Sequence, residues 1–557
     1  MSETPIRVTE PAAPATARPA HARRGGMIRS SMVYSAFTLV SRMMGFVRDL
    51  AVTYAMGASA TFAADAFNTA FAFPNLFRRI FAEGAFAAAF VPSYSRSLER
   101  DGEEVADVLA ADAMAVLAAA TLAITVVAEL TMPWLMYGIA PGFASNPAKF
   151  HLAVILTMIT MPYLPCMAIY AHLSGVLNAR NRFVLSAAAP ILLNLWTLVT
   201  VLPTRTPVEA AQWASIGVIL AGVSQAALLW WGVNRSGARV TIRKPRLTPE
   251  IKQLIMLAIP GAIAASASQI NIFISQILVS QVNGARSWLA VCDRLYLLPQ
   301  GLVGVAVGVA LLPQLSRAVG GGDKHGARAA IDQAIVFCMA LTLPAAAALF
   351  SMPYFLIDGL YTRGAFTAVD AHATAMALQQ YAWGVPAFVL AQLTSRAFFA
   401  HQDTKTPMIY ALVSVAVNIA AGVTLFRIVG VPGIAAATSL AAWVNVVMML
   451  STLHRRGLYQ PAARAWSKLA RILLAALVLG AALAIAAHSR PLIEHLFAVV
   501  RMGPLGAKEL AIVAVSALAL GAYPFLLFAS GGLTLTEARA ALQRRRGSPP
   551  EGPADLP

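Results

Sequence analysis

Long apolar runs separated by short polar segments make up most of the chain between residues 28 and 531. A helix needs about 20 mostly apolar residues to cross a bilayer. Runs such as Leu254–Ala285 and Gln333–Ile357 contain no charged side chain. The pattern predicts fourteen transmembrane helices, at about 28–56, 61–95, 105–138, 148–179, 183–203, 209–234, 250–282, 286–316, 327–358, 367–399, 406–427, 429–453, 466–488 and 507–531.

Three short patterns recur at nearly the same spacing and predict an internal repeat. Val91-Pro-Ser-Tyr-Ser-Arg96 is similar to Leu312-Pro-Gln-Leu-Ser-Arg317, Met132-Pro-Trp is similar to Met352-Pro-Tyr, and Pro165 corresponds to Pro386. We therefore expect two six-helix lobes in a parallel repeat, because an even number of helices keeps both copies in one orientation. The expected domains are a disordered tail (1–27), a first lobe (28–235), a second lobe with a preceding basic loop (236–457), two accessory transmembrane helices (458–531) and a basic tail (532–557).

The composition supports an all-α polytopic membrane protein. The 557 residues are 58% hydrophobic and 12% charged, against about 25% charged in ordinary soluble domains, and the mean hydropathy is +0.68. The net charge of +17 comes from tails and from loops on one side of the membrane, so we expect both termini in the cytoplasm and no nucleic-acid partner. The three cysteines, Cys166, Cys292 and Cys338, match no metal or disulfide spacing.

Two of the first predicted helices carry charges inside apolar sequence, where each costs at least ~2.5–3.5 kcal/mol. In the first helix, Arg42 and Asp49 are seven residues apart and share a face, while Arg48 lies roughly 120° away and can line the same cavity from its edge. Such residues normally face a partner, a water-filled cavity or a ligand.

In the second helix, Arg79 and Glu83 form an i,i+4 pair whose charges neutralise each other. Arg78 points about 100° away from Arg79 and is the more available cation. Asp65, near the start of this helix, has three interpretations: a partner for Arg42 or Arg48, a proton-linked group, or a favourable contact with the helix dipole.

The second lobe offers Asp293 and Arg294 in the helix that corresponds to the second one. An arginine from each lobe facing one cavity suits a phosphate-bearing substrate, because guanidinium binds phosphate bidentately and stays charged. Asp293 either orients Arg294 or forms a local pair with it. Four further polar residues are interpreted as charges at cytoplasmic helix ends: Arg396, His401, Asp403 and Lys405. No catalytic, phosphate-loop or metal motif is present, so we expect neither an enzyme nor a cofactor.

These charged motifs resemble the N-terminal signature of the MurJ (MviN) family of lipid II flippases, in the MOP exporter superfamily. The similar segments are Ser41-Arg-Met-Met-Gly-Phe-Val-Arg-Asp49, Ala64-Asp-Ala-Phe67, Pro74–Phe86, Phe90-Val-Pro92, Asp293-Arg-Leu295 and Gly304–Pro313. The resemblance covers nearly the whole chain and includes the fourteen-helix count.

The resemblance implies a bacterial cytoplasmic-membrane protein that moves a lipid-linked disaccharide-pentapeptide from the inner to the outer leaflet by alternating access. It implies that arginines at Arg42, Arg48, Arg78 and Arg294 line a cationic cavity, that the acid at Asp65 takes part, and that the last two helices accommodate the lipid tail. Expected partners are lipid II, membrane lipids, and proteins of cell-wall synthesis and division. The alternatives are a multidrug or metabolite antiporter of the same superfamily and a non-transporting scaffold, and the energy source stays open.

Two departures from the family pattern limit what carries over. Some members have an acid three residues after the arginine at Arg294, where this chain has Leu297. Some also bind sodium through an aspartate in helix seven, but Leu254–Ala285 contains no acid. The roles given to those two acids do not transfer to this sequence.

Overall fold

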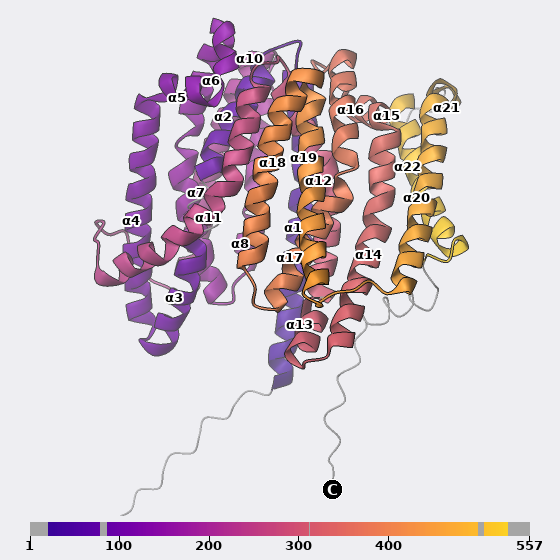
Figure 1. Ribbon diagram of the computed structural model, residues 1–557. Helices are drawn as coiled ribbons and strands as arrows, with labels where there is room; N and C mark the ends of the chain where they lie inside the picture. The colour runs from indigo at the N-terminus through magenta and orange to yellow at the C-terminus, as the bar shows by residue number, and fades with distance from the viewer. Residues whose placement is uncertain (1–19, 78–85, 311, 499–505, 533–557) are drawn as a thin grey trace, which may run out of the picture.

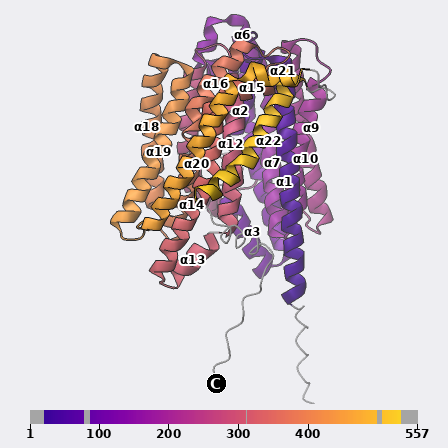
Figure 2. The same ribbon diagram turned by 90° about the vertical axis from the view of Figure 1, so that its right-hand side faces the viewer.

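The computed structural model describes residues 20–77, 86–310, 312–498 and 506–532, and the regular secondary structure in these ranges is helical. Most helices run roughly side by side in an upright bundle (Figure 1). We call the end at which α1 begins the lower end of the bundle and the opposite end the upper end (Figures 1 and 2). In the described ranges, nine helices or helix pairs are long and apolar enough to cross a membrane.

The first lobe comprises α1 to α10. α10 packs against α7 and α9, α2 packs against α6, and α1 packs against α9. The elements are α1 (Ala20–Met56), α2 (Ala63–Phe77), α3 (Phe86–Arg100), α4 (Glu103–Leu130), α5 (Met132–Ile139), the 3-10 helix η2 (Pro141–Ser145), α6 (Pro147–Thr160), α7 (Tyr163–Ala179), α8 (Val184–Ala188), α9 (Pro190–Val201) and α10 (Pro207–Arg235).

The second lobe repeats this arrangement, including the pairs of helices broken at proline-containing positions. α5 and α15 begin at Met132 and Pro353, and α7 and α17 begin at Tyr163 and Val385. The elements are α11 (Pro249–Val279), α12 (Ala285–Ala310), α13 (Leu312–Gly320), α14 (Lys324–Ser351), α15 (Pro353–Tyr361), α16 (Ala368–Ala382), α17 (Val385–Ala400), α18 (Lys405–Val429) and α19 (Val431–Arg455). The two-lobe architecture predicted from the repeat is confirmed.

Each of the fourteen predicted spans corresponds to one helix or to two consecutive helices. Five of them are not among the nine long apolar segments: α1, α2 with α3, α11, α12 with α13, and α16 with α17. The count of fourteen membrane crossings therefore stays a prediction.

Helix α1 begins earlier than expected. It starts at Ala20, so residues 20–27 are helical although the sequence pattern assigned them to a disordered tail. No proline occurs between Ala20 and Met56, and Ala20, Ala22, Arg23 and Arg24 are good helix formers, whereas Gly25 and Gly26 are not.

The accessory pair, α20 (Ala463–His488) and α22 (Ala507–Ala529), packs beside the second lobe, with the short α21 (Arg490–Leu496) after α20. At the upper end, Lys508 Nζ lies 3.1 Å from the buried Asp358 carboxylate of α15, which also pairs with Arg490. Further down α22, the Tyr523 hydroxyl donates to the Ala340 carbonyl of α14 at 2.7 Å. These contacts attach the pair to the second lobe (Figure 2).

Several helices begin at a capping residue followed by proline, which suits the first helical position because its missing N–H would have no helical acceptor. Asn146 Oδ1 accepts from the Lys149 backbone N–H at 3.1 Å at the start of α6. Thr206 and Thr248 cap α10 and α11 in the same way. The cap therefore places Lys149, in the first turn of α6, at the upper end of the bundle.

Helix α11 contacts both lobes. Ile251 and Leu254, in its first turns, are buried with residues of α3, α4 and α7. Val279, at its other end, is buried with residues of α12 and α16 in the second lobe. The lobes are thus joined by a helix that crosses between them, diagonally in Figure 1.

Candidate substrate cavity and its closed upper end

A cavity of about 1050 Å³ lies between the two lobes. Its walls come from α1, α2, α7, α9 and α10 of the first lobe and from α12 and α17 of the second. Its charged lining residues are four arginines and two aspartates: Arg42, Arg48, Arg294, Arg396, Asp49 and Asp293. The described lining therefore carries more positive than negative charge.

Asp49 holds two of these arginines, one from its own helix and one from the other lobe. Arg48 Nη2 and Nε lie 2.7 and 3.1 Å from Asp49 Oδ1. Arg294 Nε of α12 lies 2.5 Å from Asp49 Oδ2. The Arg294 side chain is 49% exposed, against 11% for Arg48, so Arg294 is the more accessible of the two cations.

Arg42 reaches the second lobe through a gap that a glycine leaves. A Cβ added to Gly301 of α12 would collide with the Arg42 guanidinium. Arg42 is exposed and lines the cavity one helical turn below Phe46. The absence of a side chain at Gly301 therefore lets a first-lobe arginine lie against the backbone of the second lobe.

The cavity contains most of the described residues that the sequence singled out. Arg42, Arg48 and Arg294 lie together, with Asp49 and Asp293 among them. Arg294 is paired with Asp49 of the other lobe. Arg78, Arg79 and Glu83 lie outside the described residues.

Arg396, expected as a charge at a helix end, lies four residues before the last residue of α17. It also lines the cavity, which the sequence did not indicate, and its Nη1 is buried without a hydrogen-bond partner. No cluster of three or more His, Cys, Asp or Glu suited to a metal occurs in the part of the chain that the structure describes.

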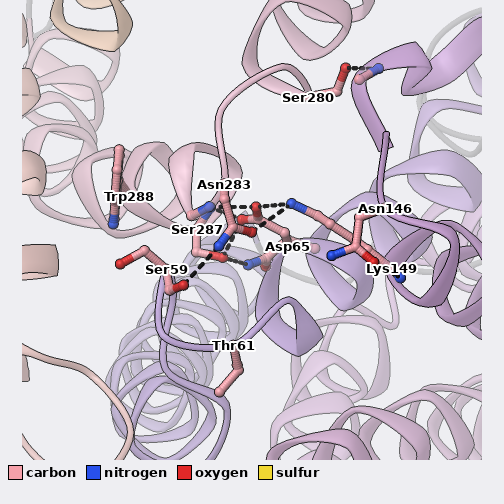
Figure 3. A network of polar contacts seen from close by, with 12 residues as sticks. Ser59, Thr61, Asp65, Asn146, Lys149, Ser280, Asn283, Ser287 and Trp288 are labelled. Carbon is pink, nitrogen blue, oxygen red and sulfur yellow. Dashed lines mark hydrogen bonds and ion pairs between the residues drawn. The ribbon is translucent and has the colours of Figure 1, made fainter. Parts of the chain in front are cut away.

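Asp65 does not face the arginines; it lies at the upper end, fully buried, where the lobes meet (Figure 3). Its Oδ2 accepts from Lys149 Nζ of α6 and from the Gly284 backbone N–H, both at 2.7 Å. Its Oδ1 accepts from the Ser287 N–H at 3.0 Å and the Ser287 hydroxyl at 2.8 Å. The interpretation of Asp65 as a partner of Arg42 or Arg48 is therefore wrong.

A second aspartate makes the reciprocal contact from the other lobe. Asp370, in the first turn of α16 and fully buried, accepts from the Ser59 backbone N–H of the first lobe at 2.8 Å and also from the Ser59 hydroxyl. The indole Nε1 of Trp288 donates to the same oxygen at 3.0 Å. Each lobe thus contributes one buried carboxylate that binds backbone N–H groups of the other lobe.

We call the contacts of Asp65, Lys149 and Asp370 with the opposite lobe the upper junction. Two positions in this junction are so close to the opposite lobe that they require glycine. Gly57 has φ +71° and a Cβ there would collide with the backbone of Ala365, while Gly284 has φ +84° and a Cβ would collide with Ser59. Lys149 completes the junction, since its Nζ also lies 3.0 Å from Asn283 Oδ1. Neither Lys149 nor Asp370 was singled out from the sequence as a contact between the lobes, although the helices that carry them begin with recognisable caps.

The bundle, its repeat and a cavity lined by charged residues between the lobes define a two-lobed polytopic membrane protein with the fold of known transporters. An inward-facing multidrug-resistance MATE transporter of the MOP superfamily matches with a TM-score of 0.63 at 14% identity, covering 77% of this chain and 98% of that one. A solved "Lipid II flippase MurJ, inward closed conformation" matches with a TM-score of 0.69 at 24% identity, covering 89% and 98%.

Sequence comparison places the chain within one family. The profile of "Lipid II flippase MurJ" matches residues 52–502. A "Probable lipid II flippase MurJ" of Rhizobium meliloti (strain 1021) is 38% identical over 525 residues, which cover 93% of this chain and 96% of that protein. The chain belongs to the MurJ family of lipid II flippases.

Proposed function

We propose that this chain is a lipid II flippase, which moves the lipid-linked peptidoglycan precursor from the inner to the outer leaflet of the cytoplasmic membrane. Membership of the MurJ family supports the substrate. The observation that carries the proposal physically is a cavity with Arg42, Arg48, Arg294 and Arg396 in its walls. Arginines suit a diphosphate because guanidinium donates to phosphate oxygens in a bidentate fork.

The lower end of the bundle faces the cytoplasm, and both termini lie on that side. The lower end contains Arg239, Arg243, Lys244 and Arg246 before α11, and Arg455 and Arg456 at the end of α19. Positive residues concentrate in cytoplasmic loops of membrane proteins. The upper junction then closes the cavity on the outer side, so that the head group enters from the cytoplasm.

Asp49 acts as an internal counter-ion of the cavity. It pairs with Arg48 and Arg294 and offsets one of their two positive charges. An entering diphosphate competes for the same donors, and Arg78 joins them as the family resemblance implies. Since Asp49 and Arg294 come from different lobes, exchanging this pair for the ligand weakens one contact between the lobes.

The transport step requires the upper junction to open. Separation of Asp65 from Gly284 and Ser287, and of Asp370 from Ser59, would expose the cavity to the outer side. This is alternating access about a fixed central site. The polyprenyl tail stays in the lipid and lies against α20 and α22, which remain attached to the second lobe.

The test replaces the native flippase with variants of this chain and measures lipid II in the outer leaflet. Arg42→Ala is expected to lower flipping by at least about 10-fold, because it removes a charge-assisted contact of about 1.5–3 kcal/mol. Arg42→Lys should retain part of the activity, since it keeps the charge but loses the fork. The matched control is Arg427→Ala, which removes an exposed arginine in the last turn of α18.

Full flipping by a stably expressed Arg42→Ala protein would contradict the role of the cavity. Loss of flipping in Arg427→Ala as well would indicate a general effect of arginine removal. Either result would leave the family assignment intact but would remove the support for the cavity as the binding site.

A further inference from the structure

The part of the cavity wall that α7, α9 and α10 form contains no charged residue but does contain a buried polar side chain. Gln225 of α10 lines the cavity and is 2% exposed. Its neighbours in the lining include Tyr163, Tyr170 and Pro190, none of which is charged. This wall therefore differs from the arginine-bearing parts of the same cavity.

A proline explains why polar groups gather here. Pro190 has no N–H, so it cannot donate to the carbonyl of Ser186 four residues earlier. The Tyr170 hydroxyl donates to that carbonyl at 3.2 Å instead. The helix breaks between α8 and α9, and the Ala189 carbonyl accepts from both the Leu192 N–H and Gln225 Nε2, each at 3.0 Å.

The contact with Ala189 also determines which end of the Gln225 amide is oxygen. A carbonyl acceptor requires the NH₂ group to face it, because two oxygens in contact would repel. The other end, Oε1, is consequently an acceptor, and it is buried without a hydrogen-bond partner. An unsatisfied buried acceptor is unfavourable. Because Gln225 lines the cavity, a small shift of its side chain would bring Oε1 to a donor supplied by a ligand.

We propose that Gln225 forms a subsite, separate from the arginines, for an uncharged hydrogen-bond donor of the transported head group. The chemical class follows from the atom: an acceptor repels phosphate oxygens but accepts from a sugar hydroxyl, an acetamido N–H or a peptide N–H. The inference rests on the proposed function, because the lipid II head group carries a diphosphate, sugars and a peptide. The diphosphate lies with the arginines, and the donor lies against the uncharged wall that α7, α9 and α10 form.

The experiment measures the binding of three probes to the purified full-length protein: lipid II, the same lipid diphosphate with the disaccharide but no peptide, and the lipid diphosphate without sugar. Gln225→Leu should weaken lipid II binding about 3- to 10-fold, the range for one hydrogen bond between neutral groups. It should leave the sugar-free diphosphate at wild-type affinity, which also shows that the cavity is folded. Gln225→Met repeats the test with an unbranched side chain.

The peptide-free probe identifies the source of the donor. Weaker binding of this probe to Gln225→Leu assigns the donor to the disaccharide, whereas weaker binding of lipid II alone assigns it to the peptide. The matched control is Gln276→Leu, at a second buried glutamine (6% exposed) with an unpartnered amide atom that is not among the residues lining the cavity.

Wild-type affinity of Gln225→Leu and Gln225→Met for all three probes would overturn the subsite. The proposed function would survive that result. It fails separately, if Arg42→Ala binds and flips lipid II normally, because the arginine contacts are common to all three probes.

Discussion

The upper junction and the central cavity both place charged side chains inside the bundle, but they differ in how fully those charges are paired. At the junction, Asp65 accepts four hydrogen bonds and Lys149 has two oxygen partners. In the cavity, Arg294 is half exposed and Arg396 has a buried nitrogen without a partner. Similar residue types thus hold the upper end closed at the junction, whereas in the cavity they leave hydrogen-bond donors available to a ligand.

The difference has a physical basis in desolvation. A fully satisfied buried network stabilises one arrangement, whereas a partly satisfied one stores unfavourable energy that a ligand can recover. The junction also lacks space, since Gly57 and Gly284 lie against the opposite lobe. We therefore expect junction variants to change how often the upper end opens, and cavity variants to change what binds.

The largest effect is expected from Asp65→Ala. It leaves Lys149, whose side chain is 5% exposed, without its counter-ion, and losing one partner of a buried pair costs about 3–5 kcal/mol. The closed junction should open more often. A cysteine at Ala64, which is 3% exposed beneath the junction, should react about 100-fold faster or more with an impermeant maleimide applied from outside. The labelling is measured in a protein in which the native cysteines Cys166, Cys292 and Cys338 are replaced.

The paired variant Asp65→Asn with Lys149→Met tests whether the charge is the cause. Removing both charges avoids the uncompensated lysine, so labelling at Ala64→Cys should return part of the way to the original rate. Equal labelling of Asp65→Ala and the parent protein would mean that the junction is not what closes the upper end.

A smaller effect is expected from replacing Gly57, at which the two lobes approach each other closely. Gly57 and Gly430 both have φ +71°, but only a Cβ at Gly57 would collide with the other lobe. Both alanine variants add backbone strain of about 1–2 kcal/mol, and Gly57→Ala adds overpacking of about 1–3 kcal/mol. Labelling at Ala64→Cys should rise about 5- to 150-fold in Gly57→Ala and stay unchanged in Gly430→Ala. Similar rates in the two variants would show that backbone strain alone acts.

Sequence reasoning predicted the lobes and most of the cavity because both depend on local rules. Apolar length and the repeat predict the helices, and the cost of charge in a membrane singles out Arg42, Arg48 and Arg294. The two departures from the family pattern, at Leu297 and in α11, can also be read directly from the residues present there.

The junction was not predictable because its bonds join distant positions. Asp65 meets Lys149 84 residues away and Ser287 222 residues away, and Ser59 meets Asp370 over 311 residues. Along the chain, Lys149 and Asp370 look like ordinary charges at helix starts. Their caps at Asn146 and Thr367 predict a helix start but do not say what lies across from it.

The smallest effect is expected from an exposed pair at the lower end. Asp403 accepts from the Thr406 hydroxyl and backbone N–H and from Arg456 Nη1 at 2.6 Å. These hydrogen bonds, those of Thr406 foremost, lower the pKa of Asp403 below its usual range. A depressed pKa gives stability that is present above the unfolded value and lost as pH falls through the folded one. Asp403→Asn should therefore lower the melting temperature by about 1 °C at pH 5–8, with the difference shrinking below about pH 4.

This variant sharpens the comparison because it removes a carboxylate with several donors, as Asp65→Ala does, but in water. Exposed ion pairs contribute little, since solvent already stabilises both charges. Arg456→Gln removes the partner and should give a shift of similar size, with no acceleration of labelling at Ala64→Cys. If Asp403→Asn opened the upper end as strongly as Asp65→Ala, hydrogen-bond number rather than burial would set the strength of closure, and the contrast between the two regions would fail.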